Sequence, residues 1–112
     1  MVEIFKTLSD QSRIRIISLL MYDDMCVCEI EAVLKFTQSN ASRHLIELKR
    51  TGILDSYKKA QWTYYKANQA FIQENKELWE YILKKSKELP TYEKDYAEYK
   101  KIREKNICNK NN

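Results

Sequence analysis

A chain of 112 residues can form one domain and is too short for two. Its hydrophobic residues, 44% of the total, are enough for a core, and its charged residues, 32%, predict a well-solvated surface. One glycine and one proline leave few interruptions, which favours a mainly helical fold. No segment approaches the roughly 20 apolar residues that span a bilayer, and no secretory signal is evident, so we expect a cytoplasmic protein with no membrane partner.

The N-terminal half shows helical periodicity in four short segments. Apolar residues recur at this spacing in Val2–Leu8, in Gln11–Met21, in Met25–Leu34, and in a helix that begins after Thr37 or Ser39 and ends at Gly52. The last two are short helices joined by a tight turn, and the second begins with polar side chains. This arrangement is typical of a helix-turn-helix.

The pattern changes after Gly52 into two β-prone runs, Ile53–Lys58 and Trp62–Lys66, which are separated by three residues. They predict a basic hairpin directly after the helix-turn-helix, which is the position of a wing. We therefore expect a mainly α fold with a small β-hairpin, that is, a winged helix-turn-helix.

The C-terminal part returns to helical spacing. Asn68 is expected to cap a long helix from about Gln69 to Glu88, and a proline soon after interrupts it. A final amphipathic helix is expected from Tyr92 to about Lys105. We thus predict a single winged helix-turn-helix domain over residues 1–112, in which residues 89–112 form a C-terminal helical extension.

The net charge of +4 is concentrated in one short stretch of the chain. Between residues 35 and 59 the cations outnumber the anions by four, so the rest of the chain sums to zero. The charged residues of this stretch are Lys35, Arg43, Lys49, Arg50, Lys58 and Lys59 against Glu47 and Asp55. A local basic patch is expected of a nucleic-acid binder, although basic runs also occur on ordinary solvated faces.

The second helix of the predicted helix-turn-helix begins with side chains suited to double-stranded DNA. Gln38 and Asn40 offer paired donors and acceptors to adenine, and Arg43 can contact guanine or a phosphate. The other candidate contacts are two hydroxyls and the cations of the wing: Ser39, Ser42, Lys58 and Lys59. We also place His44 in this DNA-binding set, with packing as its alternative role. Polar residues are common at any helix start, but the wing and the local charge favour DNA binding.

Cys26 and Cys28 lie two residues apart at the start of the first helix of the predicted helix-turn-helix. In an extended segment both side chains project to one side, whereas in a regular helix they diverge by about 200°. Two or three thiolates suit a soft, thiophilic ion, and Cys108 could supply the third. The alternatives are that the pair fills the core and that Cys108 is an incidental thiol.

Structural zinc and catalysis have less support from the residues. A closed zinc site takes four ligands, whereas this chain has three cysteines and one histidine, which is already assigned to the second helix. No glycine-rich phosphate loop and no His–Cys arrangement with an orienting acid is evident. We therefore expect neither an enzyme nor a catalytic cofactor.

Four segments together carry a family resemblance. They are Phe5-Lys6-Thr7-Leu8-Ser9-Asp10-Gln11-Ser12-Arg13-Ile14-Arg15-Ile16-Ile17, Met25-Cys26-Val27-Cys28-Glu29-Ile30, Gln38-Ser39-Asn40-Ala41-Ser42-Arg43-His44-Leu45 and Tyr64-Tyr65-Lys66. The chain from about Val2 to Glu88 resembles the ArsR/SmtB family of homodimeric winged-helix repressors, which release DNA when a metal or metalloid binds. The Cys-Val-Cys sequence, followed by an acidic and an aliphatic residue, is similar to the branch that senses arsenite and antimonite.

The resemblance implies a homodimeric repressor on operator DNA, with As(III) or Sb(III) as the effector at Cys26, Cys28 and Cys108. Many sensors of this branch have another cysteine where this chain has Glu31, so the third thiol is Cys108 or is absent. The N-terminal cysteine arm of cadmium and lead sensors is missing, and Asn68–Leu89 has no histidine for the zinc site of other members. The terminal helices are expected to form the two-fold interface.

Two other functions remain open at this stage. A repressor of the same fold could respond to thiol oxidation or to another soft metal. Alternatively, the chain could be a protein interaction module with no DNA role, in which the tyrosine-rich last helix is the docking face. Salt-dependent binding to a DNA duplex would separate this module from a repressor.

Overall fold

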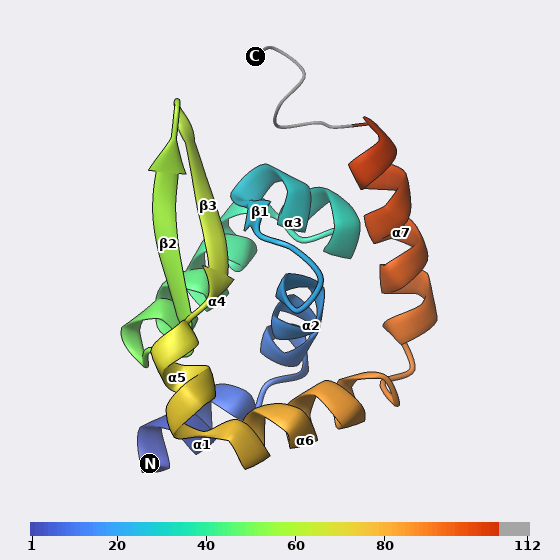
Figure 1. Cartoon of the computed structure of the whole chain (residues 1–112). Helices are drawn as coiled ribbons and strands as arrows, with labels where there is room; N and C mark the ends of the chain where they lie inside the picture. The colour runs from blue at the N-terminus through green and yellow to red at the C-terminus, as the bar shows by residue number, and fades with distance from the viewer. Residues whose placement is uncertain (106–112) are drawn as a thin grey trace.

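The computed structural model describes residues 1–105, which form a mainly helical structure with one small antiparallel sheet (Figure 1). In chain order the elements are α1 (Val2–Leu8), α2 (Gln11–Leu20), β1 (Met25–Cys26), α3 (Val27–Leu34), α4 (Gln38–Arg50), β2 (Leu54–Lys59), β3 (Trp62–Ala67), α5 (Gln69–Glu74), α6 (Lys76–Ser86) and α7 (Tyr92–Lys105). The predicted winged helix-turn-helix is confirmed, with α3 and α4 as its helices and β2–β3 as its wing. None of the described helices is long and apolar enough to cross a membrane.

The segment around Cys26 differs from the predicted helix Met25–Leu34. Met25 and Cys26 are extended and pair with Tyr65 and Tyr64 of β3, so the sheet has the strand order β1-β3-β2. Cys26 is the N-cap of α3, which begins one residue later. Hydrophobic periodicity did not reveal this strand, because a two-residue strand is too short to show a period.

The predicted long helix from Gln69 to Glu88 is interrupted at Asn75, where the backbone leaves the helical region with a φ of −136°. The Asn75 backbone and side-chain amides both donate to the Phe71 carbonyl, at 2.9 and 3.1 Å. The Asn75 carbonyl accepts the Trp79 amide at 2.8 Å. Asn75 thereby ends α5 and begins α6, a role that asparagine takes easily because its short side chain bonds to nearby backbone.

The core is centred on α2, which the other helices surround (Figure 1). Ile16 and Ile17 of α2 are fully buried. The same buried cluster receives side chains from α3, α4, α6 and α7, among them Ile30, Leu45, Leu48, Trp79, Ile82 and Ile102. Because α3 and α4 pack against this common core, their relative placement is fixed mainly by apolar burial.

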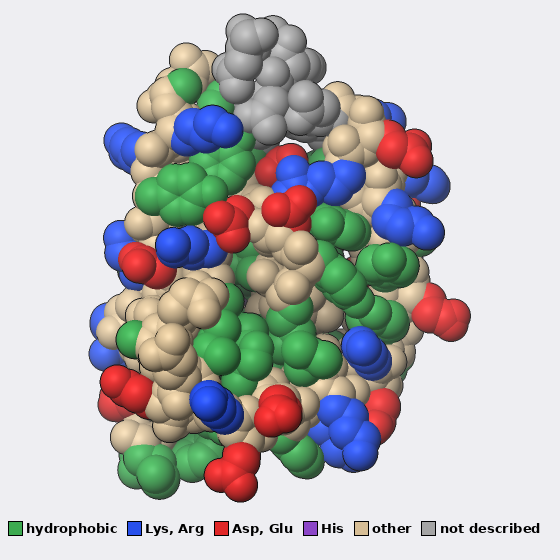
Figure 2. Space-filling view, in the orientation of Figure 1, with side chains coloured by type: hydrophobic (Ala, Val, Ile, Leu, Met, Phe, Trp, Pro, Cys, Tyr) green, Lys and Arg blue, Asp and Glu red, His purple; other side chains and the backbone are tan. Residues whose placement is uncertain are grey.

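The last helix, α7, packs on its own chain. Tyr22, just after α2, packs at a tilt against Tyr96 and stacks on Tyr99, with ring centroids 5.1 and 5.5 Å away. Arg15 of α2 donates two hydrogen bonds of 2.9 Å to Asp95. Figure 2 shows hydrophobic side chains along the junction between α7 and the rest of the molecule. The tyrosines of α7 therefore contribute to intramolecular packing.

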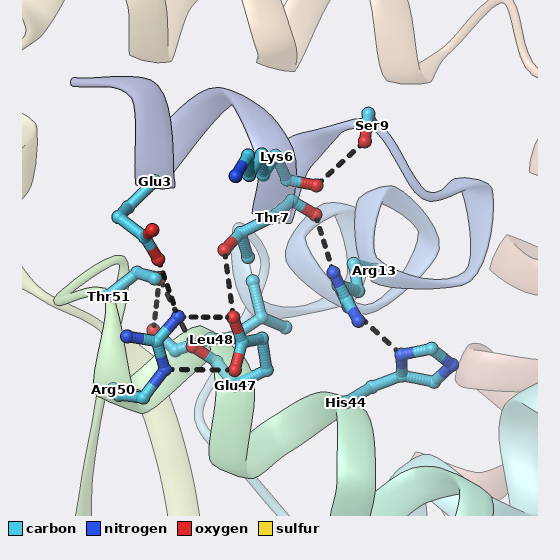
Figure 3. A network of polar contacts seen from close by, with 10 residues as sticks. All are labelled: Glu3, Lys6, Thr7, Ser9, Arg13, His44, Glu47, Leu48, Arg50 and Thr51. Atoms are coloured by element: carbon cyan, nitrogen blue, oxygen red, sulfur yellow. Dashed lines mark hydrogen bonds and ion pairs between the residues drawn. The ribbon is translucent and has the colours of Figure 1, made fainter.

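A polar network joins α4 to α1 (Figure 3). Arg50 of α4 pairs with Glu47 at 2.6 Å and with Glu3 of α1 at 2.8 Å. Thr7 donates to Glu47 at 3.5 Å. The hydrogen bonds from Arg50 lower the pKa of both carboxyls. Since exposed ion pairs are weak, we infer that this network orients α4 more than it stabilises the fold.

His44 is the buried residue beside this network, with only 3% of its surface exposed. Its Nδ1 accepts a hydrogen bond from Arg13 Nε at 3.1 Å, and its ring lies 6.2 Å from that of Phe36. These contacts favour the packing role, which was the alternative to a DNA contact for His44. Burial lowers the pKa of His44, with a smaller contribution from the nearby Arg43 and Arg13 charges.

The core predicts a clear contrast between two neighbouring residues of α4. Leu45 is fully buried, whereas Ile46 is 63% exposed. Leu45→Ala should lower the free energy of unfolding by about 2–5 kcal/mol, because it leaves a cavity in the cluster. Ile46→Ala is the control and should change it by less than about 1 kcal/mol. Urea denaturation at one protein concentration measures both; equal losses would contradict the assignment of the core face.

His44 predicts a pH dependence of stability. Because its pKa in the folded protein lies below its ordinary value of 6.5, the unfolded chain binds this proton more tightly. The contribution of neutral His44 to stability is therefore fully present above pH 6.5. It is lost as the pH falls from there through the lower pKa of the folded protein. His44→Asn keeps an acceptor for Arg13 without this proton, so its stability should fall less between about pH 7.5 and about pH 5. Identical pH profiles by urea denaturation would refute the prediction.

Candidate nucleic-acid interface and thiol site

The turn between α3 and α4 is fixed by backbone and side-chain bonds. Lys35 adopts a left-handed conformation with a φ of 62° at the end of α3, and the Phe36 amide then donates to the Glu31 carbonyl at 3.2 Å. The Thr37 hydroxyl accepts the Asn40 amide at 3.2 Å. Thr37 is thus the N-cap of α4, which settles the choice between it and Ser39.

The polar start of α4 is accessible. Gln38, Ser39 and Arg43 are exposed, and Asn40 and Ser42 are half-buried. Arg43 Nη2 donates to Asn40 Oδ1 at 2.6 Å, so these two side chains form a joined donor and acceptor group. The first turn of α4 contains no acidic residue, which leaves the positive end of the helix dipole uncompensated by side chains.

The wing carries its two predicted cations at its tip. Lys58 and Lys59 are exposed at the end of β2, and Lys59 pairs with Trp62 across a two-residue loop. Lys49 of α4 donates to Ser56 of β2 at 2.7 Å, which joins the wing to the second helix of the helix-turn-helix. The basic residues of α4 and of the wing therefore belong to one connected unit.

The two cysteines lie where the sheet meets α3. The Cys26 and Cys28 sulfur atoms are 2.7 Å apart, and no cysteine among the described residues is free. Cys26 is buried and Cys28 is half-buried, and both pack in a small cluster with Tyr64 and Trp62 of β3. The extended backbone of Cys26 allows both sulfurs to face the same side, which a regular helix would prevent.

A cleft of about 440 Å³ connects the two cysteines with two of the candidate DNA-binding residues. Its lining comes from the thiol segment, the start of α4 and the wing: Cys26, Val27, Cys28, Glu31, Gln38, Ser42, Trp62 and Thr63. The structure therefore brings together the predicted pair Cys26/Cys28 and two of the predicted DNA contacts. A ligand in this cleft would touch all three parts of the winged helix-turn-helix.

Some site residues could not be identified from the sequence. The sequence identifies Trp62 and Tyr64 only as β-prone residues, because their position beside the cysteines depends on the pairing of β1 with β3. Cys108 lies outside the described residues. Within residues 1–105 no group of three or more potential ligands from His, Cys, Asp and Glu lies close enough to hold a metal ion.

Comparisons with known proteins agree with this geometry. Residues 10–56 match the family described as bacterial regulatory protein, arsR family. The chain is 41% identical over 64 residues to the arsenic resistance transcriptional regulator ArsR1 of Pseudomonas putida, covering 56% of this chain and 50% of that protein. It is 42% identical over 64 residues to the uncharacterized HTH-type transcriptional regulator MJ1325 of Methanocaldococcus jannaschii, covering 56% of this chain and 72% of that protein.

The fold is shared with solved structures, among them reduced HlyU from Vibrio cholerae N16961. That structure has a TM-score of 0.58 and 28% sequence identity, and the match covers 69% of this chain and 85% of HlyU. The chain spans only about half the length of ArsR1. The match to the family, the relatives and the winged helix-turn-helix fold lead to one conclusion: the chain belongs to the ArsR family of bacterial regulatory proteins.

Proposed function

We propose that this chain is a DNA-binding transcriptional repressor that leaves its operator when trivalent arsenic or antimony binds Cys26 and Cys28. The observation that carries the proposal is the cleft in which these cysteines share a lining with Gln38 and Ser42. The name of ArsR1, an arsenic resistance regulator, supports the choice of effector. In this proposal residues 1–112 act as one winged helix-turn-helix domain with a C-terminal helical extension.

DNA binding would use α4 in the major groove and the wing beside it. Gln38, Asn40 and Arg43 are the candidates for base edges, since they lie on the accessible start of α4. The candidates for phosphate contacts are Ser39, Ser42, Lys58 and Lys59.

Effector binding would use thiolates as soft ligands. Each thiol that binds arsenite replaces one hydroxide of As(OH)₃, which leaves as water with the thiol proton. Cys26 and Cys28 supply two sulfurs from one short segment, and we propose Cys108 as the third. The end of α7 lies beside the pair, because Arg103 contacts Glu29, whose carboxylate also accepts the Cys26 amide. Cys108 follows Arg103 by five residues in the sequence.

The chain is also proposed to act as a homodimer. The sequence predicts the terminal helices at its interface; we keep α1 and replace α7, which packs on its own chain, with α6. Phe5 and Tyr81 are 53% and 60% exposed although both are large and aromatic. They border an apolar cavity of about 310 Å³ between α1, α2 and α6, which also includes Leu8, Leu78 and Ile82. A second copy would cover this surface, and two-fold symmetry would place two α4 helices on two half-sites.

A thiol-redox repressor is the second candidate, because Cys26 and Cys28 lie side by side in one small cluster. Oxidation by a peroxide would join Cys26 and Cys28 in a disulfide and reduce the peroxide to water or an alcohol and water. One similar structure is described as reduced HlyU, which supports a comparison of the reduced and oxidised forms of this chain. DNA release by peroxide that persists in the presence of a metal chelator would identify this mechanism.

The effector proposal predicts that arsenite releases the reduced protein from duplex operator DNA, as measured by a mobility shift. Cys26→Ser/Cys28→Ser should still bind the duplex but should not be released, because it lacks both soft ligands. Cys108→Ser should bind arsenite more weakly by ultraviolet titration if it removes the third thiolate. Release of the double variant by arsenite would refute the thiol site, and equal affinity of Cys108→Ser would reduce the site to two ligands.

The dimer proposal predicts that Phe5→Glu produces monomers in sedimentation velocity, because a carboxylate in the interface would lose its hydration. Ile46→Glu is the matched control, since Ile46 is an exposed aliphatic residue outside α1 and α6, and it should remain dimeric. A Phe5→Glu variant that sediments like the unmodified protein would place the interface elsewhere.

A further inference from the structure

Glu29 is a fully buried carboxylate directly after Cys28 in the chain. One of its oxygens accepts the Cys26 backbone amide at 3.0 Å. The other oxygen accepts a hydrogen bond from Arg103 of α7, also at 3.0 Å. A single buried side chain thus connects the backbone of the thiol segment with the last helix.

Arg103 also holds the opposite end of this segment. Its Nη2 donates to the Asp24 carbonyl, and it forms an ion pair of 3.3 Å with Asp23. Its guanidinium lies over the Tyr99 ring, 5.7 Å from the centroid. Figure 2 shows acidic and basic side chains meeting between the wing and the upper end of α7. One guanidinium therefore contacts the chain just before Cys26 and just after Cys28.

We propose that Arg103 and Glu29 are positioning residues of the thiol site, so that α7 is part of the effector-binding unit. The two sulfurs face one side because the backbone changes from strand to helix at Cys26. Arg103 holds the backbone before Cys26 through Asp24, and Glu29 holds the Cys26 amide from the first turn of α3. The expected effect on effector binding rests on the proposed function. The positioning of the Cys26 backbone can be measured without any effector.

This role is not implied by the match to the family, which covers residues 10–56 and so excludes α7. It is also distinct from the general attachment of α7. Arg15 of α2 binds Asp95 through two hydrogen bonds of 2.9 Å, and Lys35 pairs with Glu98 at 3.6 Å. These pairs attach α7 to α2 and to the turn after α3, at a distance in the sequence from the segment that carries the two cysteines.

The test compares Arg103→Met with Arg15→Met. The two variants are matched, because each removes one arginine whose ion pair with a carboxylate joins α7 to another helix. In the reduced protein without arsenite, hydrogen exchange of the Cys26 amide is followed by NMR and corrected for global stability. We expect exchange at least about tenfold faster in Arg103→Met and nearly unchanged in Arg15→Met. Arsenite affinity, from ultraviolet titration, should fall about 10–100-fold in Arg103→Met only, as for other groups that orient ligands. Arg103→Lys should recover part of both losses.

Arg103→Met leaves a buried carboxylate without its cation, so it could fail to fold. Arg103→Met/Glu29→Gln removes both charges while keeping an acceptor for the Cys26 amide, and it replaces the single variant in that case. Weaker arsenite binding by this double variant than by Arg15→Met supports the inference. The inference would be overturned if Arg15→Met changed exchange and affinity as much as Arg103→Met does. The same holds if the double variant is used in place of Arg103→Met. If the unmodified protein does not bind arsenite, but Cys26 exchange is faster only in the Arg103 variants, the effector assignment fails and the positioning role stands.

Discussion

Cys26 pairs through its backbone with Tyr64 of the wing and also caps the first helix of the helix-turn-helix. A regular helix through this position would separate the two thiols by about 200° around its axis. The change from strand to helix places both sulfurs on one side and leaves the Cys26 amide outside the helical bonds. Glu29 accepts that amide, so the geometry of the thiol pair depends on a carboxylate in the first turn of α3.

The burial of Glu29 requires the last helix. Isolating an ionised carboxylate from water is costly unless its oxygens are hydrogen-bonded and its charge is paired. The Cys26 amide and Arg103 supply these partners from two distant parts of the chain. Removing one partner of a buried pair costs about 3–5 kcal/mol, which is comparable with the loss of a large core side chain. Because exposed pairs such as Arg50–Glu3 contribute much less, Arg103 outweighs them in fixing the site.

The sequence predicts those features that repeat over many residues. The apolar spacing of α2 and the β-prone runs of the wing gave the fold, and the cysteine spacing indicated a shared direction in extended backbone. The errors lie where a single tertiary contact decides the outcome. His44 is polar and stands next to Arg43, yet it packs against Phe36 and Arg13. No local pattern connects Glu29 with Arg103, which is 74 residues away.

Two physical routes lead from the cysteine pair to the surface that is proposed to bind DNA. Through α3, a displacement must pass the buried contacts that fix α3 and α4 to α2, and such packing resists small shifts. Through the sheet, the route is direct, because Cys26 is itself paired with β3 and both cysteines belong to one cluster with Tyr64 and Trp62. An effector needs a coupling free energy of only about 1–3 kcal/mol to release DNA, which is comparable with a few altered contacts of the wing. In the proposed mechanism the wing is therefore the element most directly connected to the cysteine pair, and the same cleft borders the start of α4.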